Sequence, residues 1–144
     1  YMATRAINQD RNCYLINFST GIRTLDLSGG LGLQKVIEFL QMSFHGGTDA
    51  TPALNEALKM MKEKNYEKAD LLMISDFVMG NLPTQLIENI KDAKSSQNKF
   101  YSLAIGDLFL EGYLKDVFDG EWIYNPQNCS IHDIRKITNS IIDI

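Results

Sequence analysis

Several residue types and motifs are scarce or absent in this sequence of 144 residues, and each absence excludes a class of protein. The two cysteines, Cys13 and Cys129, are too few for a disulfide framework and form no CxxC pair, which favours a reducing compartment. No apolar run approaches the roughly 18 residues that a membrane span needs, and we expect no signal peptide. The sequence therefore predicts a cytoplasmic protein without a membrane span.

Basic clusters and catalytic signatures are also missing. The 14 Lys and Arg residues are scattered and are outnumbered by 18 Asp and Glu, which argues against a nucleic-acid partner. The sequence contains no GxSxG, no Walker A motif and no Ser/His/Asp arrangement. His45 and His132 stand too far apart in the sequence to have the spacing of metal ligands. The candidate functions that remain are the binding of a ligand through oxygen atoms and the binding of a partner through surface contacts.

Short apolar runs with the length of β-strands recur along the chain. The runs at 12–19, 69–75 and 99–106 are nearly continuous, which is typical of parallel strands covered on both faces. A weaker run lies at 121–125. The segment at 22–27 alternates between apolar and polar residues after a Ser-Thr-Gly turn, and it predicts the edge strand of a hairpin.

Helical patterns separate these runs. Apolar residues spaced three and four apart predict helices from Leu33, Leu54 and Leu86, and a capping box at Ser130 and Asp133 predicts a last helix over 131–141. Strands that alternate with helices predict an α/β fold, with a doubly wound, mostly parallel sheet and helices on both faces. Because no linker or repeat divides the sequence, we expect a single domain over residues 1–144.

Polar side chains stand where such folds bind ligands, beyond the carboxyl ends of the strands. The first run ends near Ser19, the second at Ser75 and Asp76, and an HGGTD loop with Thr48 and Asp49 opens a helix. We expect these groups to converge at one rim of the sheet. A threonine hydroxyl and a carboxylate are oxygen ligands of the kind that Mg²⁺ accepts.

Other roles could account for the same residues. Asp49 or Thr51 could cap the helix, and Gly46 and Gly47 could supply a positive φ. Asp76 could be a solvated strand end. An enzymatic alternative makes Asp76 the nucleophile of a phospho-signalling or hydrolytic α/β domain, although the sequence lacks the acidic pair near its start and the later strand-end lysine of a receiver domain.

Three segments carry a resemblance to a known family. NCYLINFST, FHGGTDATPALNEAL and ADLLMISDFVMGNLP, in this order and spacing, resemble the von Willebrand factor A (VWA) domain, in particular its bacterial ViaA and CoxE-like branch. The resemblance covers residues 1 to about 125. It implies a Rossmann-like VWA fold and a non-enzymatic adaptor function in protein–protein contact, often beside a MoxR-type AAA+ ATPase.

The resemblance also implies a metal-ion-dependent adhesion site (MIDAS), which the family builds from a D-x-S-x-S motif, a threonine and an aspartate. Thr48 matches the threonine and Asp76 the aspartate, as ligands of Mg²⁺ or Mn²⁺. The D-x-S-x-S motif is absent, and residues 1–12 resemble the end of the helix that normally follows it. We therefore expect an N-terminally truncated domain, either a piece of a longer protein or a shortened gene product. Metal binding is expected to be weak or absent here and to require the intact parent protein.

A partner-binding surface is predicted around this site, formed by His45, Asp49, Phe77, Met79 and Asp107. Phe77 and Met79 would otherwise expose apolar groups after a strand end, unless they tuck under the following helix. The missing first strand would leave apolar edges on the strands at 13–19 and 69–75. Self-association through these edges is therefore expected as well.

Overall fold

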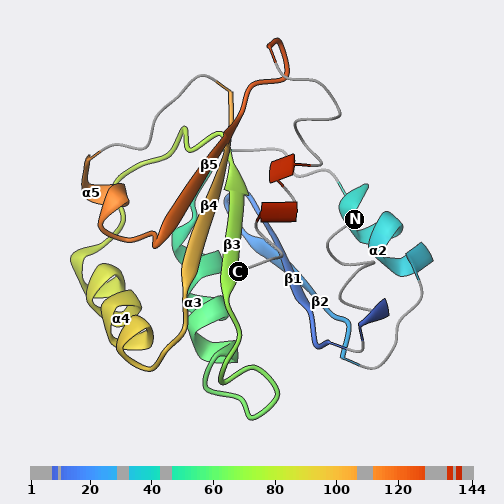
Figure 1. Cartoon of the computed structure of the whole chain (residues 1–144), viewed down its shortest axis with the longest axis horizontal. Coiled ribbons are helices and arrows are strands. Elements are labelled where there is room, and N and C mark those ends of the chain that lie inside the picture. The colour runs from blue at the N-terminus through green and yellow to red at the C-terminus, as the bar shows by residue number, and fades with distance from the viewer. Residues whose placement is uncertain are drawn as a thin grey trace. The chain divides into compact units, whose positions relative to one another are not determined.

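The computed structural model describes residues 8–9, 11–28, 33–42, 47–106, 112–128, 136–137 and 139–140. Within them helices and strands alternate, so the fold is α/β (Figure 1). The strands form an antiparallel pair, β1–β2, and a parallel sheet in the order β3–β4–β5. Residue contacts divide the chain into two compact units, one with residues 1–67 and 79–86 and the other with residues 68–78 and 87–144.

The first unit contains the hairpin and two helices, with bounds β1 Tyr14–Phe18, β2 Ile22–Asp26, α2 Leu33–Leu40 and α3 Thr51–Met60. The hairpin turn is closed by a hydrogen bond from the Ser19 N–H to the Gly21 carbonyl at 2.9 Å. The prediction of an alternating strand after a Ser-Thr-Gly turn is confirmed. Alternation places the side chains of neighbouring residues on opposite faces of the hairpin.

Each face of the hairpin contacts a different part of the first unit. On one face, the Tyr14 hydroxyl donates to Glu56 Oε1 of α3 at 3.2 Å, and the Tyr66 hydroxyl donates to Asp26 Oδ1 at 2.6 Å. On the other face, the Asn17 side-chain amide donates to the carbonyl of Met42, just after α2, at 3.4 Å. Thus α3 packs on one face of the hairpin, and the segment after α2 contacts the other.

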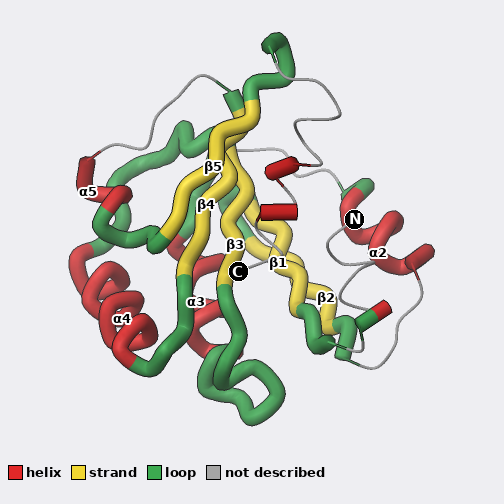
Figure 2. The backbone as a smooth tube through the Cα atoms, in the orientation of Figure 1, coloured by secondary structure: helices red, strands yellow, loops and turns green. Residues whose placement is uncertain are grey.

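The second unit is built around the parallel sheet (Figure 2), with bounds β3 Leu71–Ser75, α4 Thr84–Ser95, β4 Phe100–Ile105, α5 Gly112–Lys115 and β5 Gly120–Tyr124. By residue contacts, the first turn of α4 is grouped with the first unit. The helices α4 and α5 lie between consecutive parallel strands, because a parallel pair cannot be joined by a tight turn. Register pairs Met73 with Ser102 and Ser102 with Glu121.

The core of the second unit lies at β4, the middle strand of the three. Phe100 and Ile90 are fully buried, and Val117 is 1% exposed. A central parallel strand is covered on both faces, which explains why its sequence is almost continuously apolar. Ser102 is the exception to this apolar sequence. Its hydroxyl is fully buried and finds no hydrogen-bond partner among the described residues.

The five apolar runs predict the five strands to within two residues at each end. The helix predicted from Leu54 begins earlier, at Thr51, and the helix predicted from Leu86 begins at Thr84, directly after Pro83. The short helix α5 was not predicted, because four residues hold no apolar repeat. Most of the predicted last helix lies outside the described residues. Among the helices that the structure describes, none has the length and apolar character of a membrane span.

Candidate functional site

The loop before α3 is tied to the end of β1. The Asp49 N–H donates to the carbonyl of Ser19 at 2.8 Å, directly beyond the last residue of the strand. Thr48 precedes this bond and is half-buried, whereas the Asp49 side chain is exposed. The structure therefore brings the threonine loop to the carboxyl end of β1, which is one half of the predicted convergence.

The carboxylate of Asp49 supports the start of α3. Its Oδ1 atom accepts the N–H of Thr51, the first residue of the helix, at 2.9 Å. The residue that flanks the helix, Ala50, has no side chain able to cap it. Since the first N–H groups of a helix have no partner within it, Asp49 satisfies one of them. Asp49 thus supports the first turn of α3 from the residue before the cap position, as the capping alternative expects in kind. Among the described residues, its carboxylate makes no other hydrogen bond.

Gly47 does not have the conformation that would explain a glycine. Its φ lies outside the left-handed region, and a Cβ atom added there would meet no described atom within 4 Å. The idea that Gly47 supplies a positive φ is therefore wrong. Gly46 lies outside the described residues. Neither backbone conformation nor packing within the described chain requires a glycine at position 47.

An irregular segment, ordered locally by side-chain hydrogen bonds, follows β3 and includes Asp76. Ser75 Oγ accepts the Phe77 N–H at 3.0 Å, and Asp76 Oδ1 accepts the Val78 N–H at 3.1 Å. Phe77 itself has φ 55°, in the left-handed region that a bulky side chain rarely enters. Such a conformation costs about 1–3 kcal/mol and persists only where the surroundings enforce it. The two side-chain hydrogen bonds provide part of that enforcement.

Apolar side chains in this segment have different surroundings. The Phe77 ring packs edge to face against Phe118, with ring centroids 5.9 Å apart and an angle of 82°. Phe77 and Met79 are both half-buried, so neither is freely exposed. Phe118, a residue between α5 and β5, thus covers part of the Phe77 ring. Val78, by contrast, is 61% exposed and was missed by the sequence reasoning.

The remaining predicted residues are placed only in part. Thr48 and Asp49 belong to the first unit and Asp76 to the second, so their convergence stays a prediction. His45 and Asp107 lie outside the described residues. A threonine hydroxyl and a carboxylate are oxygen ligands of the kind that a hard cation accepts, but two ligands are fewer than its coordination shell requires. The described part of the chain holds no group of three or more His, Cys, Asp or Glu side chains placed for a metal.

Comparisons with known proteins identify relatives over most of the chain. It is 34% identical, over 121 residues, to the regulatory protein ViaA of Photorhabdus laumondii and, equally, to that of Proteus mirabilis. Each alignment covers 83% of this chain and 25% of the relative, so the chain spans about a quarter of the curated relatives it matches. No protein-family model matches the chain.

A solved structure has a similar fold. The crystal structure of an aerotolerance-related membrane protein from Bacteroides fragilis, carrying multiple mutations to serine, superposes with a TM-score of 0.61. The match covers 99% of this chain and 87% of that chain at 14% sequence identity. At this identity the similarity concerns the fold alone.

Proposed function

We propose, from the premise that this chain belongs to the ViaA-like family of von Willebrand factor A domains, that it is a non-enzymatic module for protein–protein contact. Its relatives are named regulatory proteins. The complete domain is proposed to be a doubly wound, mostly parallel sheet with helices on both faces. Its contact surface comprises the Thr48 loop and the segment at Asp76, extended by His45, Phe77, Met79 and Asp107.

The hydrogen bond from Asp49 to Ser19 carries this proposal. It holds the loop that precedes α3 at the carboxyl end of a strand, the edge at which open α/β sheets bind their ligands. Thr48, which matches the family's threonine, is therefore available at that edge. The segment after β3 supports the same proposal, because strain at Phe77 and the exposed side chain of Val78 are features of contact sites.

A divalent metal belongs to this proposal in the intact parent protein. There Mg²⁺ or Mn²⁺ would be held by Thr48, by Asp76 and by further oxygen ligands, and a partner's carboxylate would complete its shell. The metal supplies a positive charge at the contact surface. In this chain the two candidate ligands are too few for tight binding, and we propose that binding is weak or absent.

The proposed partner is a MoxR-type AAA+ ATPase, by resemblance to the family's usual assemblies. A partner surface that meets the module would cover Val78 and place an acidic group near the Thr48 loop. No chemical step is assigned to the module in this proposal. Asp76 acts as a contact and metal-binding carboxylate.

The proposal is tested by measuring the affinity of the gene product that carries this sequence for the purified MoxR-type ATPase of the same organism, with Mg²⁺ present. We expect Asp76→Ala and Thr48→Ala each to weaken binding at least about tenfold, equivalent to about 1.4 kcal/mol. Asp116→Ala, which removes an exposed carboxylate elsewhere in the second unit, should leave the affinity unchanged. Circular dichroism should show the same fold for all three variants.

Variants of Asp49 separate its capping role from contact with the partner. Asp49→Asn keeps an oxygen that can accept the Thr51 N–H but removes the charge, whereas Asp49→Ala removes both. Weaker binding by Asp49→Asn at unchanged stability supports a direct contact. Unchanged affinity for Asp76→Ala contradicts the proposal, and a covalent mass increase at Asp76 after incubation with a small phosphoryl donor favours the phospho-signalling alternative.

A further inference from the structure

Among the strands that the structure describes, β2 has an open edge. The Leu27 N–H bonds to the Cys13 carbonyl, and the Ser19 N–H bonds to the Gly21 carbonyl, so residues at odd positions form the hydrogen-bonded pairs with β1. The backbone groups of the intervening residues, Ile22 and Thr24, consequently point away from β1. Within the described part of the chain, no strand pairs with β2 on that side.

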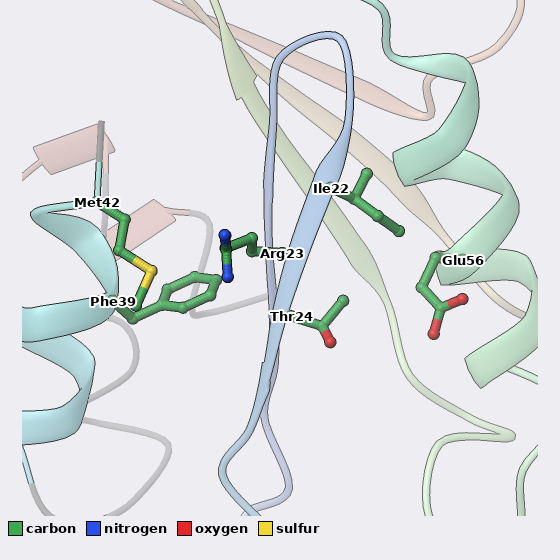
Figure 3. A pocket seen from close by; sticks show the side chains of 6 residues that line it. All are labelled: Ile22, Arg23, Thr24, Phe39, Met42 and Glu56. Atoms are coloured by element: carbon green, nitrogen blue, oxygen red, sulfur yellow. The ribbon is translucent and has the colours of Figure 1, made fainter. Parts of the chain in front are cut away.

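A hollow of about 460 Å³ runs along this edge (Figure 3). It is lined from both faces of β2. Ile22 and Thr24 lie on the side of Glu56 from α3, whereas Arg23 lies on the side of Phe39 and Met42. All of these residues belong to the first unit. The open backbone edge thus lies in a trough with a helix on either side.

The walls of the trough are held by contacts of their own. The bond from Asn17 to the Met42 carbonyl fixes one wall, and the bond from Tyr14 to Glu56 fixes the other. Phe39 is only 5% exposed, so its ring is already packed. A ligand that enters would therefore meet a preformed surface and would not have to order it.

The charges along the trough are unequal. Glu56 is occupied, because it accepts from Tyr14 and pairs with Lys59 at 3.4 Å. Arg23 is exposed and takes part in no ion pair among the described residues. Beside it stands Met42, 45% exposed, as an apolar surface. This face of the trough therefore suits a ligand with an acidic group next to an apolar one.

We propose that β2 accepts an extended segment of a protein partner as an added strand, with an acidic side chain at Arg23 and an apolar side chain against Phe39 and Met42. Main-chain hydrogen bonds to Ile22 and Thr24 give such a complex its affinity, and the side-chain contacts give it specificity. The proposal requires neither a metal nor the surface around Thr48 and Asp76. It therefore goes beyond the proposed function and can fail independently of it.

A second copy of this chain fits the edge poorly. When two β2 strands pair antiparallel through their open edges, residues at even positions lie opposite even ones and odd opposite odd. Arg23 would then lie opposite Arg23 or Leu25 of the copy and never opposite Asp26. Charge complementarity thus favours a partner whose strand carries an acidic residue.

The test uses Thr24→Pro. Proline removes the N–H that points to the open edge, and it removes no bond to β1, so the hairpin should persist. Thr24→Val is the matched control, because it keeps that N–H and favours a strand. Hydrogen exchange at Arg23 and Leu25, whose N–H groups face β1, reports whether each variant retains the hairpin. Arg23→Glu probes the charge separately.

The probes are two fluorescein-labelled synthetic peptides of equal length, a Val/Asp peptide with the repeat Val-Thr-Asp-Thr and a Val/Lys peptide with the repeat Val-Thr-Lys-Thr, so that Val and the charged residue share one face of the extended strand. We expect the Val/Asp peptide to bind and to slow amide exchange at Ile22 and Thr24, and Thr24→Pro to weaken this binding at least about tenfold. Thr24→Val should bind normally, and Arg23→Glu should prefer the Val/Lys peptide. Equal binding by the wild type and Thr24→Pro, or no binding of either peptide, overturns the proposal. If protection of Ile22 and Thr24 rises with the concentration of the protein when no peptide is present, a second copy occupies the edge, and this result also overturns the proposal.

Discussion

At the scale of single residues, the hydroxyl of Tyr66 joins the loop after α3 to the hairpin. It donates to Asp26 Oδ1 at 2.6 Å, and its ring packs edge to face on Tyr14. Burial, together with the hydrogen bond to Asp26, raises the pKa of Tyr66 to about 12. Burial acts to raise the pKa of Asp26, but hydrogen bonds from Tyr66 and Ser28 outweigh it and the pKa is lowered.

Tyr66→Phe should lower the free energy of unfolding at neutral pH by about 1.5–3 kcal/mol, the range for a hydrogen bond to a charged group. In the wild type, the contribution of Tyr66 is complete below pH 10.0 and is lost as the pH rises towards about 12, because ionisation is easier in the unfolded chain. The contribution of Asp26 to stability is present above pH 3.8 and is lost as the pH falls below that value.

Urea unfolding at a series of pH values measures the loss of stability at both alkaline and acidic pH. Tyr66→Phe should show a shallower decline in stability above pH 10.0 than the wild type. A residual decline is expected from Tyr101, whose pKa is also raised, first by burial and then by Asp70 and Asp119. An identical alkaline profile in the variant would mean that the bond to Asp26 does not contribute to stability.

At the scale of elements, Asp119 joins α4 to two strands of the parallel sheet. Its Oδ2 atom accepts the N–H of Phe100 at 2.9 Å, and its own N–H donates to the Phe100 carbonyl at 2.7 Å. Lys94 of α4 pairs with Asp119 Oδ1 at 2.9 Å and also reaches the Val117 carbonyl at 3.3 Å. One carboxylate thus fixes the start of β4, the approach to β5 and the last turn of α4.

Asp119→Ala should destabilise the protein by about 2–3 kcal/mol, because it leaves the N–H of the fully buried Phe100 without its acceptor. Asp119→Asn keeps a side-chain oxygen for that N–H and should cost less. Lys94→Met should cost about 1 kcal/mol or less, since the ion pair is partly exposed to solvent. Urea unfolding followed by the fluorescence of Trp122 measures all three. Equal losses for Asp119→Ala and Asp119→Asn would assign the effect to charge.

At the scale of the whole molecule, the two candidate metal ligands come from different compact units. Thr48 is in the first and Asp76 in the second, and Asp76 Oδ1 already accepts a backbone N–H. We expect calorimetric titration of this chain with Mg²⁺ or Mn²⁺ to give no binding at micromolar metal, because one hydroxyl and one carboxylate supply few ligands of an octahedral shell. Asp76→Asn serves as the control and should give the same trace. A tight stoichiometric site that Asp76→Asn abolishes would contradict this expectation.

The candidate site was predictable where its signal is local in sequence. The structural role of Asp49 could be anticipated, because Asp is favoured near helix starts, where its carboxylate accepts a free backbone N–H. The packing of Phe77 on Phe118 could not, because their contact joins positions far apart in sequence. The left-handed conformation of Phe77 and the exposure of Val78 were likewise not predicted, because no local sequence pattern indicates them.

The sequence by itself determined the α/β class, the five strands and the helices α2 to α4, because apolar spacing and turn residues act within a few positions of the chain. Only the tertiary structure decided which backbone edges and side chains stay uncovered. Within the described residues, the open edge of β2 beside Thr24 and the lack of an ion pair at Arg23 depend on how separate segments pack. The burial of side chains and the pairing of strands depend on contacts between residues that are distant in the sequence, and local sequence patterns do not specify these contacts.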